Sequence, residues 1–286
     1  MYLIKISHTT VYEYSIPVQL KTHKLYLRPR DGHDIRIQSS LLDIQPATPV
    51  KWQRDIYGNS MALIDFAEKT NHLSIRSEVV VEHYETAPLD FMVADKAINF
   101  PFQFDPTERI DLIPYQIPIF PSDTGPLQEW VSQFWKPGEY AETYTLLDRI
   151  NKKIVSEFRY EMREEPGVQR PAETLRKASG SCRDFSTLFI EACRYLNLPA
   201  RFVSGYLHCP ETVQGHGSTH AWSEVYLPGA GWKGFDSTSG QVVGADHIAT
   251  AVSRRPENIP PVSGSFVGPQ DVSSRMDVTV DVKRLG

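Results

Sequence analysis

The first third of the chain alternates apolar and polar residues, and turn-forming residues interrupt the alternation at short intervals. The pattern is clear in the stretch 2–6 and returns in the stretch 73–81. Alternation of this kind is typical of β-strands with one buried face. Because residues 1–86 show no helical period, they predict an N-terminal antiparallel β-sandwich domain. Residues 275–286 alternate again, and we expect them to join this domain.

A proline-rich segment, residues 87–125, follows the β-rich part. Proline lacks a backbone N–H and has a restricted φ, so we expect this segment to resist both helix and central strand. Its many aromatic residues make it too apolar for a free linker, which predicts an ordered crossing between two domains. Residues 126–274 then predict a second domain that opens with helices at about 126–136 and 143–158.

An amphipathic helix is predicted to begin at Cys182. Ser181 stands at the N-cap position and Asp184 lies three residues on, a variant of the capping box. The Cys182 sulfur would then lie beside unpaired N–H groups at the positive end of the helix dipole, which stabilises a thiolate. The apolar positions follow a helical period and form one stripe: Phe185, Leu188, Phe189, Ala192, Cys193 and Leu196.

Three strands are predicted after this helix, at 200–207, 220–227 and 232–236. Residues 228–231, with the sequence Pro-Gly-Ala-Gly, form a strong turn between the second and third strands. The second and third strands therefore predict an antiparallel hairpin.

This hairpin brings two chemically important residues together. It places Asp236 opposite Trp222 or Ser223, with His220 as its diagonal neighbour and within reach of a hydrogen bond. Cys182, His220 and Asp236 would supply an attacking thiol, a base and an orienting carboxylate, the set that a thiol-nucleophile enzyme needs. The sequence predicts these three residues as a catalytic triad.

Several short motifs accompany the triad: Gly180-Ser181-Cys182-Arg183-Asp184, Leu198-Pro199-Ala200-Arg201, Val203-Ser204-Gly205-Tyr206, His220-Ala221-Trp222 and Pro228-Gly229-Ala230-Gly231-Trp232. Over roughly residues 140–245 they resemble the transglutaminase-like superfamily of papain-like cysteine enzymes. The β-rich part also looks like the N-terminal domain of bacterial two-domain members. The resemblance implies an α+β fold, with a papain-like transglutaminase core whose cysteine helix packs on an antiparallel sheet. It implies Cys182 as nucleophile, His220 as base and Asp236 as the residue that orients the base.

One position departs from the family pattern. Members usually carry proline after the aspartate, whereas here Ser237 follows Asp236. Because serine adds an N–H and removes the fixed φ of proline, we expect a looser loop and an unchanged triad.

The two tryptophans and the two other cysteines of this region give weaker indications of function than the triad. Trp222 and Trp232 are candidates for the walls of a substrate groove, although large aromatics in strands more often pack in a core. Cys193 belongs to the apolar stripe of the helix and Cys209 to a loop, so both are expected to be structural.

Neither a metal nor a cofactor is expected. His208, Cys209, His216 and His220 lie near one another in sequence and could be interpreted as a zinc cluster, but the two histidines of the His-x3-His pair fall in a Gly/Ser-containing loop and not on a helix. The chain also lacks a calcium-binding loop, a P-loop and a dinucleotide fingerprint.

Composition and charge favour a globular enzyme. The chain is 41% hydrophobic and 23% charged, with a formal net charge of −5. This balance indicates neither a nucleic acid nor an anionic membrane as partner, and no apolar run approaches the roughly 18 residues of a membrane helix. With no signal-peptide pattern and three cysteines that lack close pairing, a reducing cytoplasm is expected.

The expected chemistry is acyl transfer from a peptide or protein amide through a thioester on Cys182, with the backbone N–H of Cys182 as an oxyanion donor. Water as acceptor makes the protein a peptidase or amidase, and a lysine amine makes it a transglutaminase. Hydrolysis is the favoured expectation, because no sequence feature indicates a site that shields the thioester from water. A non-catalytic peptide-binding module on the same fold is an alternative of another class.

Overall fold

The computed structural model describes residues 1–85, 87–163, 165–209 and 218–285. Its helices are α1 (Pro106–Gln116), α2 (Thr124–Val131), α3 (Thr143–Glu157), α4 (Pro171–Lys177) and α5 (Cys182–Tyr195), with 3-10 turns η1 (Asp95–Ala97), η2 (Pro121–Asp123) and η3 (Pro256–Asn258). The strands of the β-rich part are β1 (Tyr2–Leu20), β2 (His23–Leu25), β3 (Ile35–Gln45), β4 (Val50–Arg54), β5 (Ser60–Ile64), β6 (Thr70–His83), β16 (Val262–Ser263), β17 (Phe266–Val267) and β18 (Ser274–Leu285). The other strands are β7 (Asn99–Phe100), β8 (Ala141–Glu142), β9 (Arg159–Tyr160), β10 (Ser179–Gly180), β11 (Ala200–Leu207), β12 (Ser218–Leu227), β13 (Gly231–Asp236), β14 (Gln241–Val242) and β15 (His247–Ser253). Within these ranges, no helix is both long enough and apolar enough to cross a membrane.

The β-rich part is a sandwich of two antiparallel sheets. One sheet has the strand order β17-β1-β6-β3, with β18 also paired to β1, and the other has the order β16-β2-β5-β4. The alternation seen in the sequence gives each sheet one apolar face, and the two faces bury each other. Their shared core contains Val18, Leu20, Leu25, Ile44, Ile64, Leu73 and Ile75.

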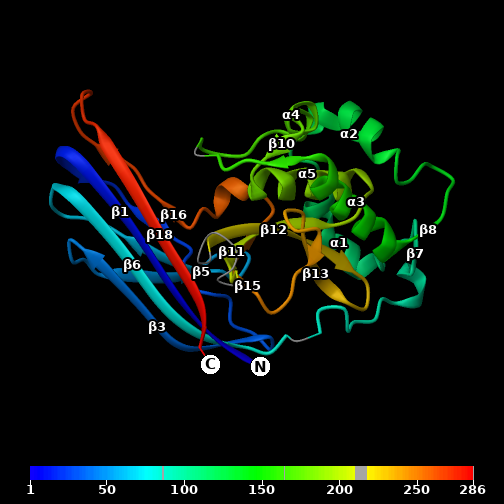
Figure 1. Ribbon diagram of the computed structural model, residues 1–286, viewed down its shortest axis with the longest axis horizontal. Coiled ribbons are helices and arrows are strands. Elements are labelled where there is room, and N and C mark those ends of the chain that lie inside the picture. Colours follow the sequence, from blue (N-terminus) through cyan, green and yellow to red (C-terminus); the bar gives the residue numbers. More distant parts are fainter. Residues whose placement is uncertain (86, 164, 210–217, 286) are drawn as a thin grey trace.

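The last strand of the chain lies against the first. β18 pairs antiparallel with β1 from Leu285 opposite Leu3 to Ser274 opposite Tyr14. Figure 1 shows β1, β6 and β18 running side by side along one flank of the molecule, while the helices gather on the opposite flank. Residues from both ends of the chain therefore complete one sheet.

The second part of the fold is a helix packed on an antiparallel sheet, as the sequence predicts. The sheet has the order β14-β13-β12-β11-β15, and α5 lies against β12 and β11. Every apolar position of the predicted helical stripe is buried, and Cys193 is one of them. The core between helix and sheet contains Leu188, Phe189, Ala192, Cys193, Ala221, Val225, Leu227 and Phe235. The molecule is thus an α+β protein with few helices and mostly antiparallel sheets.

A buried ion pair on α5 anchors the proline-rich segment. Arg194 Nη1 donates to Glu191 Oε1 at 2.7 Å, and both side chains are almost fully buried. The same guanidinium donates to the backbone carbonyls of Tyr115 and Ala200, and Glu191 Oε2 accepts the N–H of Ile119. These backbone contacts satisfy charges that would otherwise be very costly to bury.

The expectation that the proline-rich segment resists helix is wrong for residues 106–116, which form α1. Pro106 occupies the first helical turn, where a backbone N–H would have no partner in the helix in any case. Pro114 lies in the last turn, so the hydrogen bond that it removes is close to the frayed end. A proline-rich composition therefore allowed a short helix because the prolines stand near its two ends.

Contacts between the sandwich and the helix-on-sheet part combine apolar packing with hydrogen bonds. Tyr206 and Ile248 of the second sheet share one apolar cluster with sandwich residues Ile4, Ile6, Val79, Val81 and Val282. The Tyr206 hydroxyl lies 2.9 Å from His8 Nδ1, and His83 Nε2 donates to the backbone carbonyl of His247 at 3.2 Å. The sandwich thus holds β15 as well as β11.

Gly205 on β11 is placed where no larger residue fits. A Cβ atom at this position would lie 2.3 Å from the backbone oxygen of Ile248 and 2.6 Å from Cη2 of Trp222. Since the neighbouring strand cannot move away easily, we expect Gly205→Ala to lower the free energy of unfolding by about 1–3 kcal/mol or more. Urea denaturation monitored by tryptophan fluorescence measures this change.

Gly125→Ala in α2 is the matched control, because no atom lies within 4 Å of the Cβ position there. The same substitution in an open helical site should leave stability unchanged or raise it by up to about 1 kcal/mol. Equal stability of the two variants would contradict the close packing at Gly205.

Candidate active site

The N-terminus of α5 presents Cys182 as its first residue, where the sequence places it. The thiol is half-buried, and the neighbouring Ser181 takes the N-cap position in an extended conformation. N–H groups in the first turn of a helix have no partner within the helix, so this turn offers a positive environment to the sulfur.

Asp184 holds this helix end in place. Its Oδ2 accepts hydrogen bonds from the N–H and the hydroxyl of Ser181, each at 2.8 Å, and its Oδ1 accepts from the N–H of Gln169 at 2.7 Å and from Arg163 Nη1 at 2.8 Å. Burial alone would raise the pKa of the Asp184 carboxyl, but these hydrogen bonds hold it below its ordinary value. The predicted capping carboxylate is therefore also the buried half of an ion pair with the partly exposed Arg163.

His220 and Asp236 meet across the β12–β13 hairpin. Ser223 pairs with Phe235, so Asp236 comes opposite Trp222, as the sequence predicts. His220 Nε2 lies 3.0 Å from Asp236 Oδ2, and both side chains are buried. The hairpin register alone accounts for this contact.

The second nitrogen of His220, Nδ1, remains for Cys182. Burial by itself lowers the pKa of His220, but hydrogen bonding to the Asp236 carboxylate and to the neighbouring Cys182 outweighs it and raises the pKa above its ordinary value. A histidine that stays protonated beside a thiol favours an imidazolium–thiolate pair. The structure thus brings the three predicted residues together in the order thiol, imidazole, carboxylate.

The turn after Asp236 is well held, in contrast to the looser loop expected from the missing proline. Thr238 N–H donates to Asp236 Oδ1 at 2.9 Å and the Ser239 hydroxyl donates to Oδ2 at 3.0 Å. Ser237 is fully buried, and its hydroxyl donates to Asn151 Oδ1 of α3 at 2.8 Å. Side-chain hydrogen bonds take over the restraint that a proline ring would supply.

A second histidine, His247, also contacts Asp236, and sequence reasoning missed it. Its Nε2 lies 3.2 Å from Asp236 Oδ2, while its Nδ1 accepts the N–H of Gly244 at 3.4 Å. The acceptor role of Nδ1 places the proton on Nε2, which therefore donates to the carboxylate. Donation from His220 and His247 outweighs burial and holds the pKa of Asp236 far below its ordinary value. No local motif marks His247, because β15 joins the site only through the sheet order.

The same three groups are the best arranged for a metal among the described residues. One ligand atom each from His220, Asp236 and His247 lies within 4.8 Å of the others. Both histidine nitrogens, however, stand at N–H···O distance from one carboxylate oxygen, and a protonated nitrogen cannot bind a metal. We therefore assign the cluster to hydrogen bonding.

The described members of the zinc cluster considered from sequence are engaged in other ways. His208 Nδ1 lies 2.8 Å from the carboxylate of Asp246. His216 lies outside the described residues. Burial and the carboxylates of Asp246 and Asp236 raise the pKa of Cys209, which disfavours the thiolate that zinc requires.

The proposed substrate role is wrong for Trp222, whereas for Trp232 it stays a prediction at a position far from the triad. Trp222 is only 1% exposed and packs among Val203 and Val252, with its ring against those of His220 and His247. A side chain buried in this way cannot line an open groove. Trp232 pairs with Tyr226 at the other end of β12, and at about 3.3 Å per residue this lies roughly 20 Å from His220. The Arg201 guanidinium lies over its ring, and Tyr115 and Tyr226 contact the ring edge-to-face.

Tyr160 is a half-exposed aromatic residue beside the thiol. It pairs with Gly180 in the short β9–β10 ladder and packs against Phe185, so it stands next to the start of α5. Burial, followed by the charges of Cys182 and Asp236, raises the pKa of Tyr160 to about 12. Its hydroxyl therefore stays protonated at neutral pH and can donate a hydrogen bond near the sulfur.

Comparisons with known proteins agree with this arrangement. Residues 4–82 match the model of the bacterial transglutaminase-like N-terminal region, and residues 136–237 match that of the transglutaminase-like superfamily. Uncharacterized proteins of Mycobacterium tuberculosis and Mycobacterium leprae are 27% and 24% identical to the chain, over 97% and 100% of its length and 91% and 100% of theirs. A crystal structure from Cytophaga hutchinsonii, described as a "putative cysteine protease", shares the fold with a TM-score of 0.76 at 20% identity, covering 100% of this chain and 91% of that one.

Replacement of the capping carboxylate tests the anchoring of α5. Asp184→Asn removes the buried charge that pairs with the partly exposed Arg163, and we expect the free energy of unfolding to fall by about 2–3 kcal/mol, more than the roughly 0.5–2 kcal/mol of a cap alone. Because folding lowers the pKa of Asp184, its contribution is present above the unfolded pKa and is lost as pH falls through the folded one. Urea unfolding at pH 7 and pH 3 should therefore show the two proteins converging in acid.

Asp148→Asn provides the control, because Asp148 forms an exposed i,i+4 pair with Lys152 on α3. Removing this carboxylate should lower the free energy of unfolding by less than about 0.5 kcal/mol. Similar losses for the two variants would contradict a special role for Asp184.

Replacement of His247 tests the support of Asp236. His247→Ala removes one donor, so the pKa of Asp236 should rise and the carboxylate should neutralise at a higher pH. The His220 ring should then be held less firmly, and iodoacetamide alkylation of Cys182 near neutral pH should slow by about tenfold, the equivalent of one hydrogen bond to a charged group. Intact-mass analysis across pH measures this, with buried Cys193 as the unreactive reference because burial raises its pKa.

His247→Gln keeps an N–H donor at a similar position and should restore the wild-type profile. Identical pH profiles for the alanine variant and the wild type would show that His247 does not act through Asp236.

Proposed function

Because the chain belongs to the transglutaminase-like superfamily, we propose that it is a cysteine-nucleophile enzyme that hydrolyses peptide or side-chain amides through a thioester. The observation that carries the proposal is the buried hydrogen bond between His220 Nε2 and Asp236, which leaves the other imidazole nitrogen for Cys182 at the start of α5. In this role the thiol is the nucleophile, the imidazole moves the proton and the carboxylate orients the imidazole.

In the acylation step the Cys182 sulfur attacks the amide carbonyl carbon and forms a C–S bond. His220 Nδ1 then gives its proton to the leaving nitrogen as the C–N bond breaks, so an amine leaves and a thioester remains. The raised pKa of His220 suits this step, because the imidazolium is available at neutral pH.

The carbonyl oxygen becomes negatively charged in this step and needs donors. The N–H of Cys182 lies in the first turn of α5, where the helix supplies no acceptor. The Tyr160 hydroxyl is our candidate for the second donor, because it stands beside the start of the helix and stays protonated.

In the second step water attacks the thioester, and His220 accepts its proton as the C–S bond breaks. A protein amine in place of water would make the chain a transglutaminase, which is the second candidate function. We favour water because the Cys182 thiol is only partly buried and its neighbour Tyr160 is half-exposed, which supports an approach open to solvent.

We also propose a reducing compartment such as the cytoplasm for this activity. All three cysteines are free, and a nucleophilic thiol must stay reduced to act. A non-catalytic peptide-binding module is the less favoured alternative, because binding alone does not require a buried carboxylate to orient a histidine.

A two-acceptor assay separates these activities. The wild-type protein, given a glutamine-containing protein and a fluorescent primary amine, should release ammonia or cleave peptide and incorporate little amine. An ammonia assay measures the first product, and mass spectrometry of the protein measures peptide cleavage and amine incorporation. Amine incorporation above hydrolysis at millimolar amine would favour the transglutaminase.

Cys182→Ala should abolish every product, because both routes share the thioester. Cys193→Ala is the matched control and should keep activity where the protein folds, since that thiol is buried within the helix stripe. Absence of turnover in the wild type on any amide would favour the binding module.

A further inference from the structure

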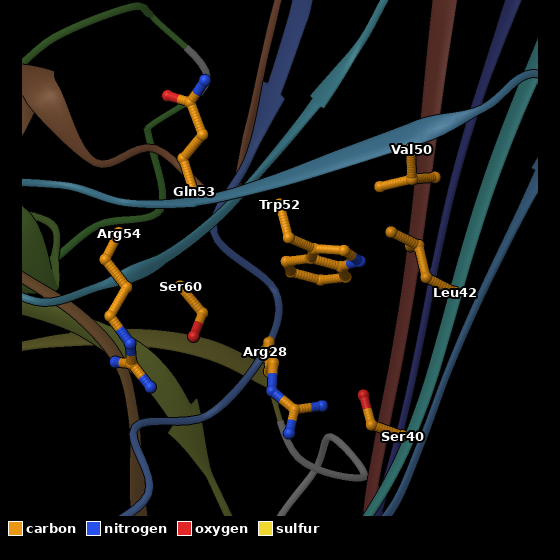
Figure 2. Close-up of a pocket in the computed structure, with 8 residues that line it drawn as sticks. All are labelled: Arg28, Ser40, Leu42, Val50, Trp52, Gln53, Arg54 and Ser60. Atoms are coloured by element: carbon orange, nitrogen blue, oxygen red, sulfur yellow. The ribbon is translucent and has the colours of Figure 1, made fainter.

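A hollow opens at one edge of the sandwich, outside the candidate active site. It has a volume of about 620 Å³ and lies between β3 of one sheet and β4 and β5 of the other. Leu42 and Val50 form its apolar inner wall and border the sandwich core. The hollow, here named the β3–β4 hollow, is lined by Arg28, Ser40, Leu42, Val50, Trp52, Gln53, Arg54 and Ser60 (Figure 2).

Trp52 is unusually exposed for its size. Its side chain lies in the middle of the hollow with the apolar wall on one side and Arg28 below it (Figure 2). The residue is 49% exposed, although a large aromatic side chain is normally buried to a much greater extent. An accessible indole beside an apolar wall offers a place for an apolar side chain from another molecule.

The charge of the hollow is positive although the chain as a whole is acidic. The eight residues in Figure 2 include two arginines and no acid, whereas the formal net charge of the chain is −5. Arg30 lies near Arg54 but also near the carboxylates of Asp55 and Glu224, so the positive charge of the hollow comes from Arg28 and Arg54. Guanidinium groups in a concave surface attract carboxylates and bind them bidentately.

The walls of the hollow are edge strands. β3 pairs only with β6 and β4 pairs only with β5 among the described strands, so each has one backbone edge without a partner strand there. An open edge can add an extended peptide through main-chain hydrogen bonds, which a nucleotide or a simple anion cannot form in the same way. This property distinguishes a peptide from other anionic ligands.

We propose that the β3–β4 hollow binds an extended acidic peptide segment. Carboxylates of the segment pair with Arg28 and Arg54, and an apolar side chain of the segment packs on Trp52. Binding itself does not depend on the chemistry at Cys182. That such a segment belongs to the substrate rests on the proposed function, and it would then hold a peptide or protein on the sandwich while an amide enters the active site.

The test uses the whole chain with Cys182→Ala, so that no turnover occurs. A fluorescein-labelled peptide of about eight residues with alternating Glu and Leu, the length of a typical strand, is titrated and followed by fluorescence anisotropy. We expect binding that weakens as salt is raised. Arg28→Gln and, separately, Trp52→Ala should each raise the Kd by about tenfold, the effect of losing one charge-assisted hydrogen bond or one aromatic contact.

Lys51→Gln is the matched control. It removes one positive charge from the same strand, but Lys51 pairs with Asp65 and alternation places it on the opposite side of β4 from Trp52. Its Kd should stay within about twofold of the parent. Circular dichroism and thermal unfolding test whether each variant is folded. Because the Trp52 side chain is half-exposed, we expect Trp52→Ala to leave the fold intact.

Three results would overturn the proposal: no binding at millimolar peptide, equal weakening by Lys51→Gln, or equal binding of a peptide with Gln in place of Glu. Displacement by inorganic phosphate at the same concentration as the peptide would also overturn it, because a simple anion site would then explain the binding. Failure of the wild type to hydrolyse amides would leave the peptide-binding result intact, so the two proposals can fail separately.

Discussion

A buried carboxylate is stable only when donors surround it, and the candidate active site depends on how the fold meets this requirement at Asp236. The side chain is 1% exposed, and an unpaired charge at such a depth would cost several kcal/mol. Its donors come from different strands: His220 from β12, His247 from β15, and the turn that follows Asp236 itself. The sheet must therefore be complete before the carboxylate is satisfied. Once it is, the carboxylate fixes the ring of His220 and raises its pKa.

The sandwich contributes to this site although none of its residues belongs to the triad. His83 at the end of β6 donates to the backbone carbonyl of His247, and His8 contacts Tyr206 on the neighbouring strand. The apolar cluster shared by the two parts packs against β11 and β15 of the active-site sheet. A substitution in the sandwich can thus change the position of a histidine on Asp236 without touching the triad. The sandwich acts as a scaffold for one face of the active-site sheet.

Short-range patterns were enough to predict much of the fold and part of the site. The start of α5 at Cys182 follows from a local capping pattern, and the contact of His220 with Asp236 follows from the register of one hairpin. His247 was missed because β15 joins the sheet on the far side of β11, and no spacing along the chain encodes that order. Trp222 was misplaced for a related reason: alternation shows that it shares a face with His220, but only the tertiary fold shows that this face is covered.

The α1 helix is a second element that the local sequence pattern did not predict. Composition counts prolines, whereas helix formation depends on where they stand within the turn, and Pro106 and Pro114 stand near the two ends. The segment also gains contacts with α5 that its own sequence does not contain, through Glu191 and Arg194. Tertiary contacts outweigh a weak local propensity in this case.

The pairing of β18 with β1 affects how the protein emerges from the ribosome. β18 is synthesised after every residue of the helix-on-sheet part, yet its partner β1 is made first. During synthesis the β1 edge stays open, and an open edge can pair with another chain. Contacts between such distant segments also form slowly. The residues of the cysteine helix are therefore made before the sandwich can close, and until β18 is made the β1 edge stays open to other chains.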